Sequence, residues 1–240
     1  MDPKEPNSSE PASVVASLRQ LIVEGRYPPG ARLAEIPVAL ALGVSRTPVR
    51  LAFRTLQQEG LLEKSGKRGR VVRAFSEEDV RCAVEVRGVL EGLAARRLAE
   101  RGANAALLTT LGECLAEGER VLADGRLSES HIARWSELNR TFHDTLVRGG
   151  GGRVIADAIA RNDHLPFASA SSIAIDRQAL DKELRKLQLA QLHHRLIVDA
   201  IEQRESARAE MLMREHSLIG LRYGAFLGLE APAARLNRNP

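Results

Sequence analysis

Four residues in the C-terminal two-thirds of the chain have the types and spacing of a metal site. Asn139 and His143 are four positions apart, so on a helix they share one face and can contact one ion. His194 and His216 are 22 positions apart, and their midpoint, residue 205, falls in an expected turn between two helices. Positions symmetric about the turn of an antiparallel hairpin lie at the same height, so the two rings are expected to meet. Three imidazoles and one amide oxygen suit Zn²⁺, Ni²⁺ or a similar divalent ion and leave coordination positions open.

The alternative for each histidine taken alone is a surface or core residue without a ligand. The joint spacing favours the metal site over that alternative. His193 is adjacent to His194 but points about 100° away on an ideal helix, so it is left out of the site. His131 and His164 have no partner at matched spacing.

A second stretch, residues 39–60, has the layout of a helix-turn-helix. A short apolar helix runs into Gly43, Ser45 follows as an N-cap, and Pro48 lies in the first turn of the next helix. One face of that helix is expected to be buried, through Val49, Ala52, Phe53 and Leu56. Arg46, Thr47 and Arg50 lie off that face, where the second helix of such a motif reads the DNA major groove. The alternative is an ordinary helical hairpin.

A basic hairpin follows this motif. Residues 61–63 and 71–72 read as two short strands around a loop with two glycines and the cations Lys67, Arg68 and Arg70. This predicts the wing of a winged helix-turn-helix, with side chains placed to reach the DNA backbone or the minor groove. A merely solvated basic hairpin is the alternative.

The elements expected around these two sites are mostly helical. Val14, Leu18, Leu21 and Ile22 mark a first helix, and residues 33–42 supply a second. A winged helix-turn-helix over residues 11–75 is then followed by an all-helical bundle over residues 76–228, with a disordered leader at 1–10 and a loose tail at 229–240. Six helices are expected in the bundle, the first with Ser76 as its N-cap, over residues 76–101, 104–123, 130–147, 153–163, 179–203 and 206–226.

Charge is divided unevenly between the two parts. Residues 1–75 hold 12 Lys/Arg and 7 Asp/Glu, a balance of +5, and the rest holds 23 and 24, a balance of −1. The excess positive charge therefore lies with the expected DNA-binding part. No apolar run approaches about 18 residues and no signal pattern is present, so a soluble, cytoplasmic protein without membrane contact is expected. Cys82 and Cys114 form neither a metal spacing nor a disulfide framework.

The N-terminal motifs resemble those of the GntR family of bacterial transcription regulators. The resemblance rests on residues 29–35, 42–50 and 56–62. Two positions depart from the family pattern: Ile36 stands where Arg is usual, and Leu51 where Glu is usual. The first departure removes one family DNA contact and points to a distinct operator. The residues expected to contact DNA are Arg32, Ser45, Arg46, Thr47, Arg50, Lys67, Arg68 and Gly69.

The C-terminal part resembles the helical ligand-binding domain called FCD, found in the FadR branch of that family. The FCD metal motif matches Asn139, His143, His194 and His216, with Asn139 where Asp is commoner, a departure that weakens metal affinity. Six helices point to the VanR-type subdivision. Residues 85–99 and 160–170 are similar to vanillate-responsive repressors. The resemblance covers about residues 12–226.

The resemblance implies a small carboxylate effector beside the metal. Arginine pairs with carboxylates through a planar fork, and Arg87 and Arg161 are expected on bundle helices among apolar neighbours. The alternative is a surface or salt-bridge role, which Glu91, four positions after Arg87, makes serious. Phe142 and Phe167 could wall a pocket for an aromatic acid or belong to the core.

These observations predict a homodimeric, ligand-responsive transcriptional repressor. It binds a palindromic operator in double-stranded DNA and is released by a small carboxylic acid, with an aromatic acid such as vanillate as the candidate. The alternative is a metal-dependent enzyme acting on a small organic acid at the three-His site. Against the enzyme, no general base stands out near the histidines, and a basic winged head has no role in it.

Overall fold

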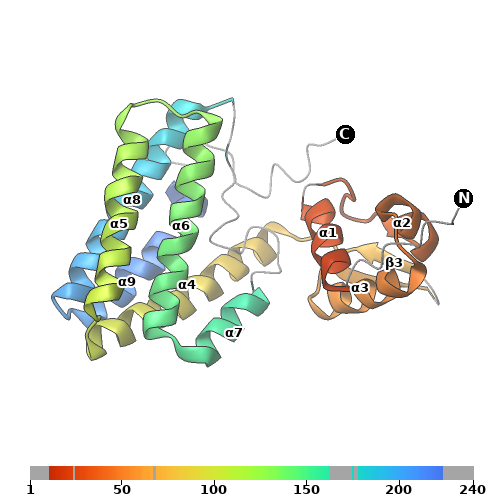
Figure 1. Ribbon diagram of the computed structural model, residues 1–240, viewed down its shortest axis with the longest axis horizontal. Helices are drawn as coiled ribbons and strands as arrows, with labels where there is room; N and C mark the ends of the chain where they lie inside the picture. The colour runs from red at the N-terminus through yellow and green to blue at the C-terminus, as the bar shows by residue number, and fades with distance from the viewer. Residues whose placement is uncertain (1–10, 24, 67–68, 163–174, 176–177, 224–240) are drawn as a thin grey trace, which may run out of the picture. The chain divides into compact units, whose positions relative to one another are not determined.

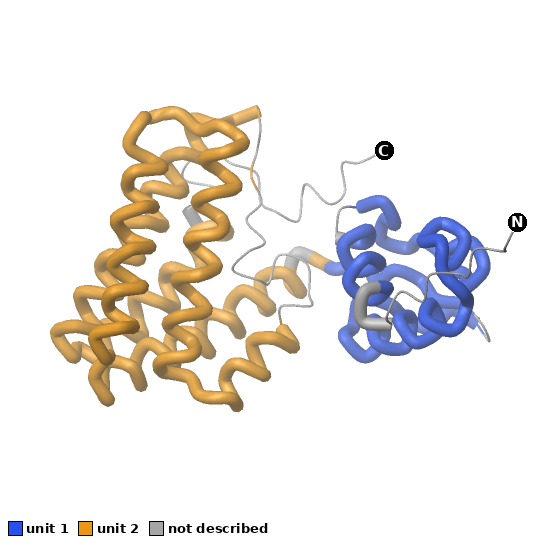
Figure 2. Tube along the Cα trace, viewed as in Figure 1, with its two compact units in different colours: residues 1–75 blue, residues 76–240 orange. Residues whose placement is uncertain are grey.

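The structure, a computed structural model, describes residues 11–23, 25–66, 69–162, 175 and 178–223. The chain divides into two compact units, residues 1–75 and residues 76–240 (Figure 2). The expected leader, the whole expected tail, and the wing residues Lys67 and Arg68 lie outside the described residues. Each unit has its own hydrophobic core.

The first unit packs three helices against a small sheet. The helices are α1 (Pro11–Val23), α2 (Glu35–Leu42) and α3 (Arg46–Gln58). As predicted, Val49, Ala52, Phe53 and Leu56 form the buried face of α3, where they meet Val14 and Leu18 of α1 in one core. This apolar stripe fixes the orientation of α3, so the polar face of that helix is left at the surface.

The sheet has one strand more than the sequence indicated. Its strands β1 (Arg32–Leu33), β2 (Leu62–Ser65) and β3 (Gly69–Val72) are antiparallel in the order β1-β3-β2. Leu33 was expected at the start of the second helix. It lies instead in β1, where it pairs with Arg70 of β3, and α2 begins two residues later. A strand of two residues carries no periodic signal, and only its pairing with β3 defines it.

The turn between α2 and α3 follows the prediction in part. Gly43 ends α2 with φ +66°, the left-handed conformation that glycine adopts without a Cβ clash. Ser45 occupies the N-cap position of α3 with extended backbone, but its hydroxyl makes no capping hydrogen bond. The hydroxyl thus remains at the surface, at the start of the helix expected to read DNA. The mostly helical class with a winged helix-turn-helix is confirmed.

The second unit is a bundle of six α-helices in the part of the chain that the structure describes (Figure 1). A capping box between Ser76 and Asp79 starts the first of them. The last one ends at Ser217 and is followed by the π-helix η1 (Ile219–Tyr223), where one continuous helix to residue 226 was expected. The six are α4 (Glu77–Arg101), α5 (Ala105–Ala123), α6 (Glu129–Gly150), α7 (Gly152–Asn162), α8 (Leu180–Glu202) and α9 (Ser206–Ser217).

Glycines 149 and 150 do not break the chain where the sequence indicated. Helix α6 continues through Gly150. A Cβ at this position would overlap the carbonyl oxygen of Ala94 and crowd Leu98, both on α4. The missing side chain therefore lets α6 and α4 approach closely. The break falls one residue later, and Gly152 carries the positive φ.

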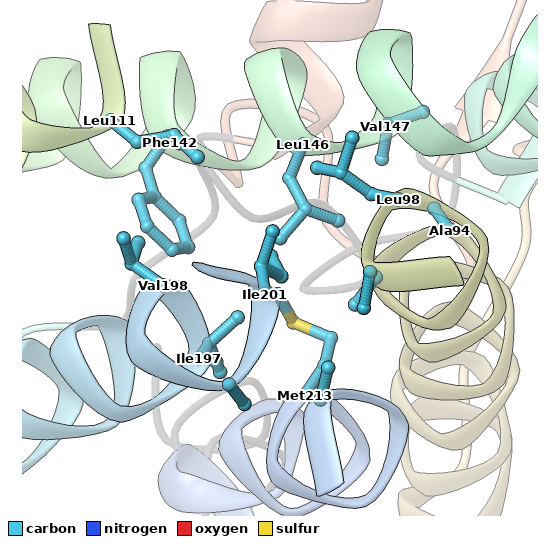
Figure 3. Packing of buried hydrophobic residues seen from close by; sticks show 14 of the residues in the cluster. Ala94, Leu98, Leu111, Phe142, Leu146, Val147, Ile197, Val198, Ile201 and Met213 are labelled. Atoms are coloured by element: carbon cyan, nitrogen blue, oxygen red, sulfur yellow. The ribbon is translucent and has the colours of Figure 1, made fainter. Parts of the chain in front are cut away.

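The bundle core lies where α4, α5, α6, α8 and α9 converge. Phe142 and Leu146 from α6, Ile201 from α8 and Met213 from α9 pack together there (Figure 3). Their side chains are almost completely buried. A dry core next to polar residues raises the strength of every electrostatic interaction among them.

Among the described residues, no single helix is long and apolar enough to span a membrane. By length and composition alone, only α2 and α3 taken together could do so, and this pair is bent by 111°.

Candidate metal centre and DNA-reading surface

Three histidine rings from three helices meet inside the bundle. Nε2 of His216, on α9, lies 3.2 Å from Nε2 of His143, on α6, and 3.2 Å from Nε2 of His194, on α8. All three side chains are buried. The hairpin of α8 and α9 thus brings positions 194 and 216 to the same height, and α6 contributes the third ring. The three ring nitrogens lie within 4.8 Å of one another, close enough to share one ion.

A proton count shows why these nitrogens suit a cation. The Glu91 carboxylate, on α4, accepts from Nδ1 of His143 at 3.0 Å, which places the ring proton on Nδ1 and leaves Nε2 with a lone pair. Nε2 of His216 faces two neighbouring nitrogens but can carry one hydrogen at most. That hydrogen can be donated fully to only one of them. A divalent ion would accept all three lone pairs, so the donor set fits a metal.

Glu91 contacts one of these histidines, a contact that the sequence did not reveal. Its side chain is 2% exposed and contacts His143, as well as Arg87 on its own helix, where Nε lies 3.7 Å from Oε2. Burial raises the pKa of Glu91, but its contacts with His143 and Arg87 outweigh burial, so its pKa lies below the ordinary value. A carboxylate behind a ligating histidine fixes the tautomer and orientation of the ring.

Aromatic rings hold His194 in place. Phe142 stacks on the His194 ring at 4.0 Å between centroids, and Trp135 stacks at 6.0 Å. The Trp135 Nε1–H donates to Oε1 of Gln191, whose own amide donates to the carbonyl of Leu115. The ring is therefore fixed by packing. Phe142, one of the two expected pocket residues, is fully buried, and Phe167 lies outside the described residues.

Burial also keeps two of the rings neutral. The pKa of His194 and the pKa of His216 lie well below the ordinary value of 6.5, chiefly because burial penalises the charged form and secondarily because neighbouring histidines repel it. Neutral imidazole is the form that binds a metal.

The remaining polar candidates take different places. Asn139 is buried one turn before His143 on α6, as the spacing predicted. His193 is half-buried, with its ring 6.1 Å from that of His216. His131 lies near the surface against the carbonyl of Arg126, and His164 lies outside the described residues.

The two arginines expected at the effector site differ in environment. Arg87 is buried, 9% exposed, and forms an ion pair with Glu91, so the alternative partner is indeed present. Arg161 is exposed in the last turn of α7, which contradicts its expected position among apolar neighbours. Position 161 lies on the face of α7 that is exposed to solvent.

The first unit presents the expected DNA contacts at its surface. All are exposed except Gly69, which begins β3, and the wing residues Lys67 and Arg68, which lie outside the described residues; the exposed ones are Arg32, Ser45, Arg46, Thr47 and Arg50. Ile36 and Leu51, the two departures from the family pattern, are also exposed, by 56% and 42%. Glu35, at the start of α2, forms ion pairs with both Arg46 and Arg50.

Comparison with known families settles the class of this protein. Residues 11–72 match the bacterial regulatory proteins of the gntR family, and residues 82–218 match the FCD domain. The chain belongs to the GntR family, in its FCD-containing branch. These residues include both the helix-turn-helix and the three-His cluster.

Full-length relatives agree with this assignment. The protein named "Probable D-xylose utilization operon transcriptional repressor" of Paenarthrobacter nicotinovorans is 32% identical over 212 residues, which cover 85% of each chain. The HTH-type transcriptional regulator YdhC of Bacillus subtilis is 28% identical over 83% of this chain and 84% of its own. The solved structure of E. coli McbR/YncC shares the fold, with a TM-score of 0.61, 18% identity and coverage of 92% and 97%.

The protein is therefore a DNA-binding, ligand-responsive transcriptional regulator, and the enzyme alternative is not supported. In this GntR-family chain, sequence reasoning missed two acidic residues, Glu35 and Glu91. Glu91 carried a signal, because it lies four positions after Arg87, but its contact with His143 joins two helices 52 positions apart. Nothing in the sequence, apart from its place next to Ile36, indicated that Glu35 contacts the arginines of α3.

Proposed function

We propose that this regulator holds one divalent cation at His143, His194 and His216, with the Asn139 side chain as a fourth ligand. The convergence of three ring nitrogens, with Glu91 behind one of them, carries the proposal. The bound ion would supply a Lewis-acidic centre with open positions for an effector. The neutral Asn139 removes one negative charge from the ligand set, so the affinity is expected to be lower than with Asp.

The effector is proposed to be a small carboxylate that completes the metal's coordination. Arg87 is the stronger candidate for its second contact, because it is buried beside the histidines and carries a fork for carboxylates. An exposed Arg161 is the weaker one. The finer assignment is a VanR-type domain that binds an aromatic acid such as vanillate, and it rests on the six helices of the bundle and on the likeness of residues 85–99 and 160–170.

DNA binding is proposed to use two copies of the chain on a palindromic operator. Arg46, Thr47 and Arg50 would read base edges, while Arg32, Ser45 and the wing would hold phosphates. Effector binding would change the separation of the two winged helix-turn-helix units and release the operator. The protein would then be a repressor acting in the cytoplasm. By linkage, operator DNA must then weaken effector binding by the same factor.

The experiment is a thermal-shift screen on the full-length protein in three states: metal-free, loaded with Zn²⁺, and loaded with Ni²⁺. Metal should raise the Tm of the wild type, since a ligand at 100 times its Kd stabilises by about 2.7 kcal/mol. Phenolic and aliphatic acids are then added to each state. Acids that stabilise only the metal-loaded protein would support the proposed effector site.

The control is His143→Ala, which should abolish the metal-dependent shift while His131→Ala retains it. Metal content after gel filtration, near one ion per chain for the wild type and near none for His143→Ala, checks the same point independently. An equal shift with both variants would overturn the site. An effector affinity unchanged by saturating operator DNA would overturn the release mechanism.

A further inference from the structure

Glu35 joins the two arginines of the helix expected to enter the major groove. Its Oε1 accepts from Nε of Arg50 at 2.9 Å, and its Oε2 accepts from Nη2 of Arg50 at 2.9 Å and from Nη2 of Arg46 at 3.2 Å. Arg46 and Arg50 lie one turn apart on α3, and Glu35 is the first residue of α2. The carboxylate thus links the start of α2 to the N-terminal part of α3, the two helices of the helix-turn-helix.

The two arginines are held to different degrees. Arg50 is held by two parallel hydrogen bonds, which fix both the position and the plane of its guanidinium. Arg46 is held by one, around which it can still rotate. These bonds lower the pKa of Glu35 to about 2, so the carboxylate is ionised at any pH used for DNA binding. The side chains of Arg46 and Arg50 are 59% and 52% exposed.

Donor geometry decides what Arg50 can still bind. A guanidinium has five N–H donors. The two bonds from Arg50 to Glu35, called the clamp below, take one hydrogen from Nε and one from Nη2 on the same side. The outer edge, formed by Nη1 and the second hydrogen of Nη2, points away from Glu35. That edge matches the two acceptors, O6 and N7, that guanine presents in the major groove.

We propose that Glu35 is a positioning residue for DNA reading, which holds Arg50 so that its outer edge donates to O6 and N7 of one guanine. The proposal rests on the assignment of α3 as the recognition helix. Arg50 then arrives at the groove already oriented, so less side-chain freedom is lost when it binds. Arg46, held by a single bond, can turn to a phosphate or to a second base.

The first unit offers a matched control for this clamp. Glu59, at the end of α3, accepts three hydrogen bonds from Arg19 of α1, through the same two nitrogens, Nε and Nη2, that Arg50 uses. That pair ties two helices together at residues not expected to contact DNA. Neutralising either glutamate changes the net charge of the unit by the same amount, but only one of them touches a reading arginine.

The experiment selects preferred sites from a pool of random-sequence double-stranded DNA with the full-length protein. The variants are Glu35→Gln, Glu59→Gln, Arg50→Lys and the double variant Glu35→Gln/Arg50→Lys. Arg50→Lys identifies the base pair that Arg50 reads, as the position where the preference for guanine falls. Glu35→Gln should weaken the preference at that same position by about tenfold, within the range of one bidentate contact.

The remaining variants separate geometry from charge. Glu59→Gln should leave every base preference unchanged, and the double variant should be no less selective at that position than Arg50→Lys alone. Glu35→Asp keeps the charge but withdraws the carboxylate by one methylene, so it should lose preference at the same base pair without a gain in binding to random DNA. Melting curves run beforehand set an assay temperature at which every variant is folded.

Two results would overturn the clamp. One is an enriched site whose preferences Glu35→Gln leaves intact, and the other is a loss spread equally over all positions or shared with Glu59→Gln. A wild-type protein that enriches no sequence would overturn the assignment of α3 as the reading helix, and the clamp with it. The failure of the clamp alone is therefore distinguishable from the failure of the reading helix.

Discussion

Two glutamates, Glu35 and Glu91, each contact two basic groups, but in opposite surroundings. The Glu35 side chain is 24% exposed and contacts Arg46 and Arg50 at the surface of the first unit. The Glu91 side chain is 2% exposed and contacts Arg87 and His143 inside the bundle. Water competes for the polar atoms of Glu35 and its two arginines, but it is excluded from Glu91 and its two partners.

The difference agrees with what each unit is proposed to bind. An arginine that reads DNA has to remain accessible, so its carboxylate partner is at the surface and contributes orientation more than stability. Rings proposed to hold an ion have to stay neutral and fixed, and their carboxylate partner is buried. A glutamate therefore contacts a solvated arginine in one unit and a buried histidine in the other.

The largest effect on stability is expected at the contact between α4 and α6, the helices that carry Glu91 and His143. Gly150→Ala should destabilise the second unit by about 3 kcal/mol or more, because the new Cβ overlaps the backbone of α4 at Ala94. Urea unfolding measures this. Gly112→Ala on α5 is the control: its Cβ meets nothing within 4 Å, so alanine should stabilise by about 0.5–1 kcal/mol. Equal effects of the two substitutions would contradict the close contact of α4 and α6.

A second effect is expected from pH, in the metal-free protein. His194 and His216 have pKa values well below 6.5 when folded, so below pH 6.5 the unfolded chain binds more protons than the folded one. The stability they contribute is present above pH 6.5 and is lost as the pH falls from there towards their folded pKa values. The slope approaches about 1.4 kcal/mol per pH unit for each histidine.

Urea unfolding in a chelator at pH 7.5, 6.5 and 5.5 measures this slope. The double variant His194→Gln/His216→Gln should flatten the dependence, while His131→Gln should retain it. A stability that stays constant across this range in the wild type would show that the two rings are not held neutral.

A third effect concerns metal affinity. Glu91→Gln should weaken metal binding by about 10- to 100-fold, because the amide no longer fixes the tautomer and orientation of His143. Competition with a colorimetric chelator measures it. Glu100→Gln, on the same helix but 52% exposed, should leave the affinity unchanged. If both substitutions had the same effect, Glu91 would act through the charge of α4 alone.

The smallest effect is expected from the exposed pair. Glu35→Gln should lower the Tm of the first unit by less than about 5 °C, since exposed ion pairs contribute little to stability. Differential scanning calorimetry of the full chain measures it. A larger loss would mean that Glu35 holds the fold together, and the contrast with Glu91 would disappear.

Helical periodicity made much of this architecture predictable. The buried face of α3 and the N-cap at Ser76 followed from local spacing, which depends on the geometry of one helix. The extent of α6 did not, because glycines 149 and 150 are also tolerated in a helix when another backbone comes close. Strand β1 was missed for a related reason: two residues show no pattern until β3 lies beside them.

The sequence by itself determined which residues could serve each purpose. The matched spacing of His194 and His216, and the arginines at the start of α3, are properties of single helices and one hairpin. Only the tertiary structure decided which carboxylates these residues contact. Glu91 reaches His143, and Glu35 reaches Arg50, because separate helices pack at one particular height, which depends on side-chain volumes throughout each core rather than on any local pattern.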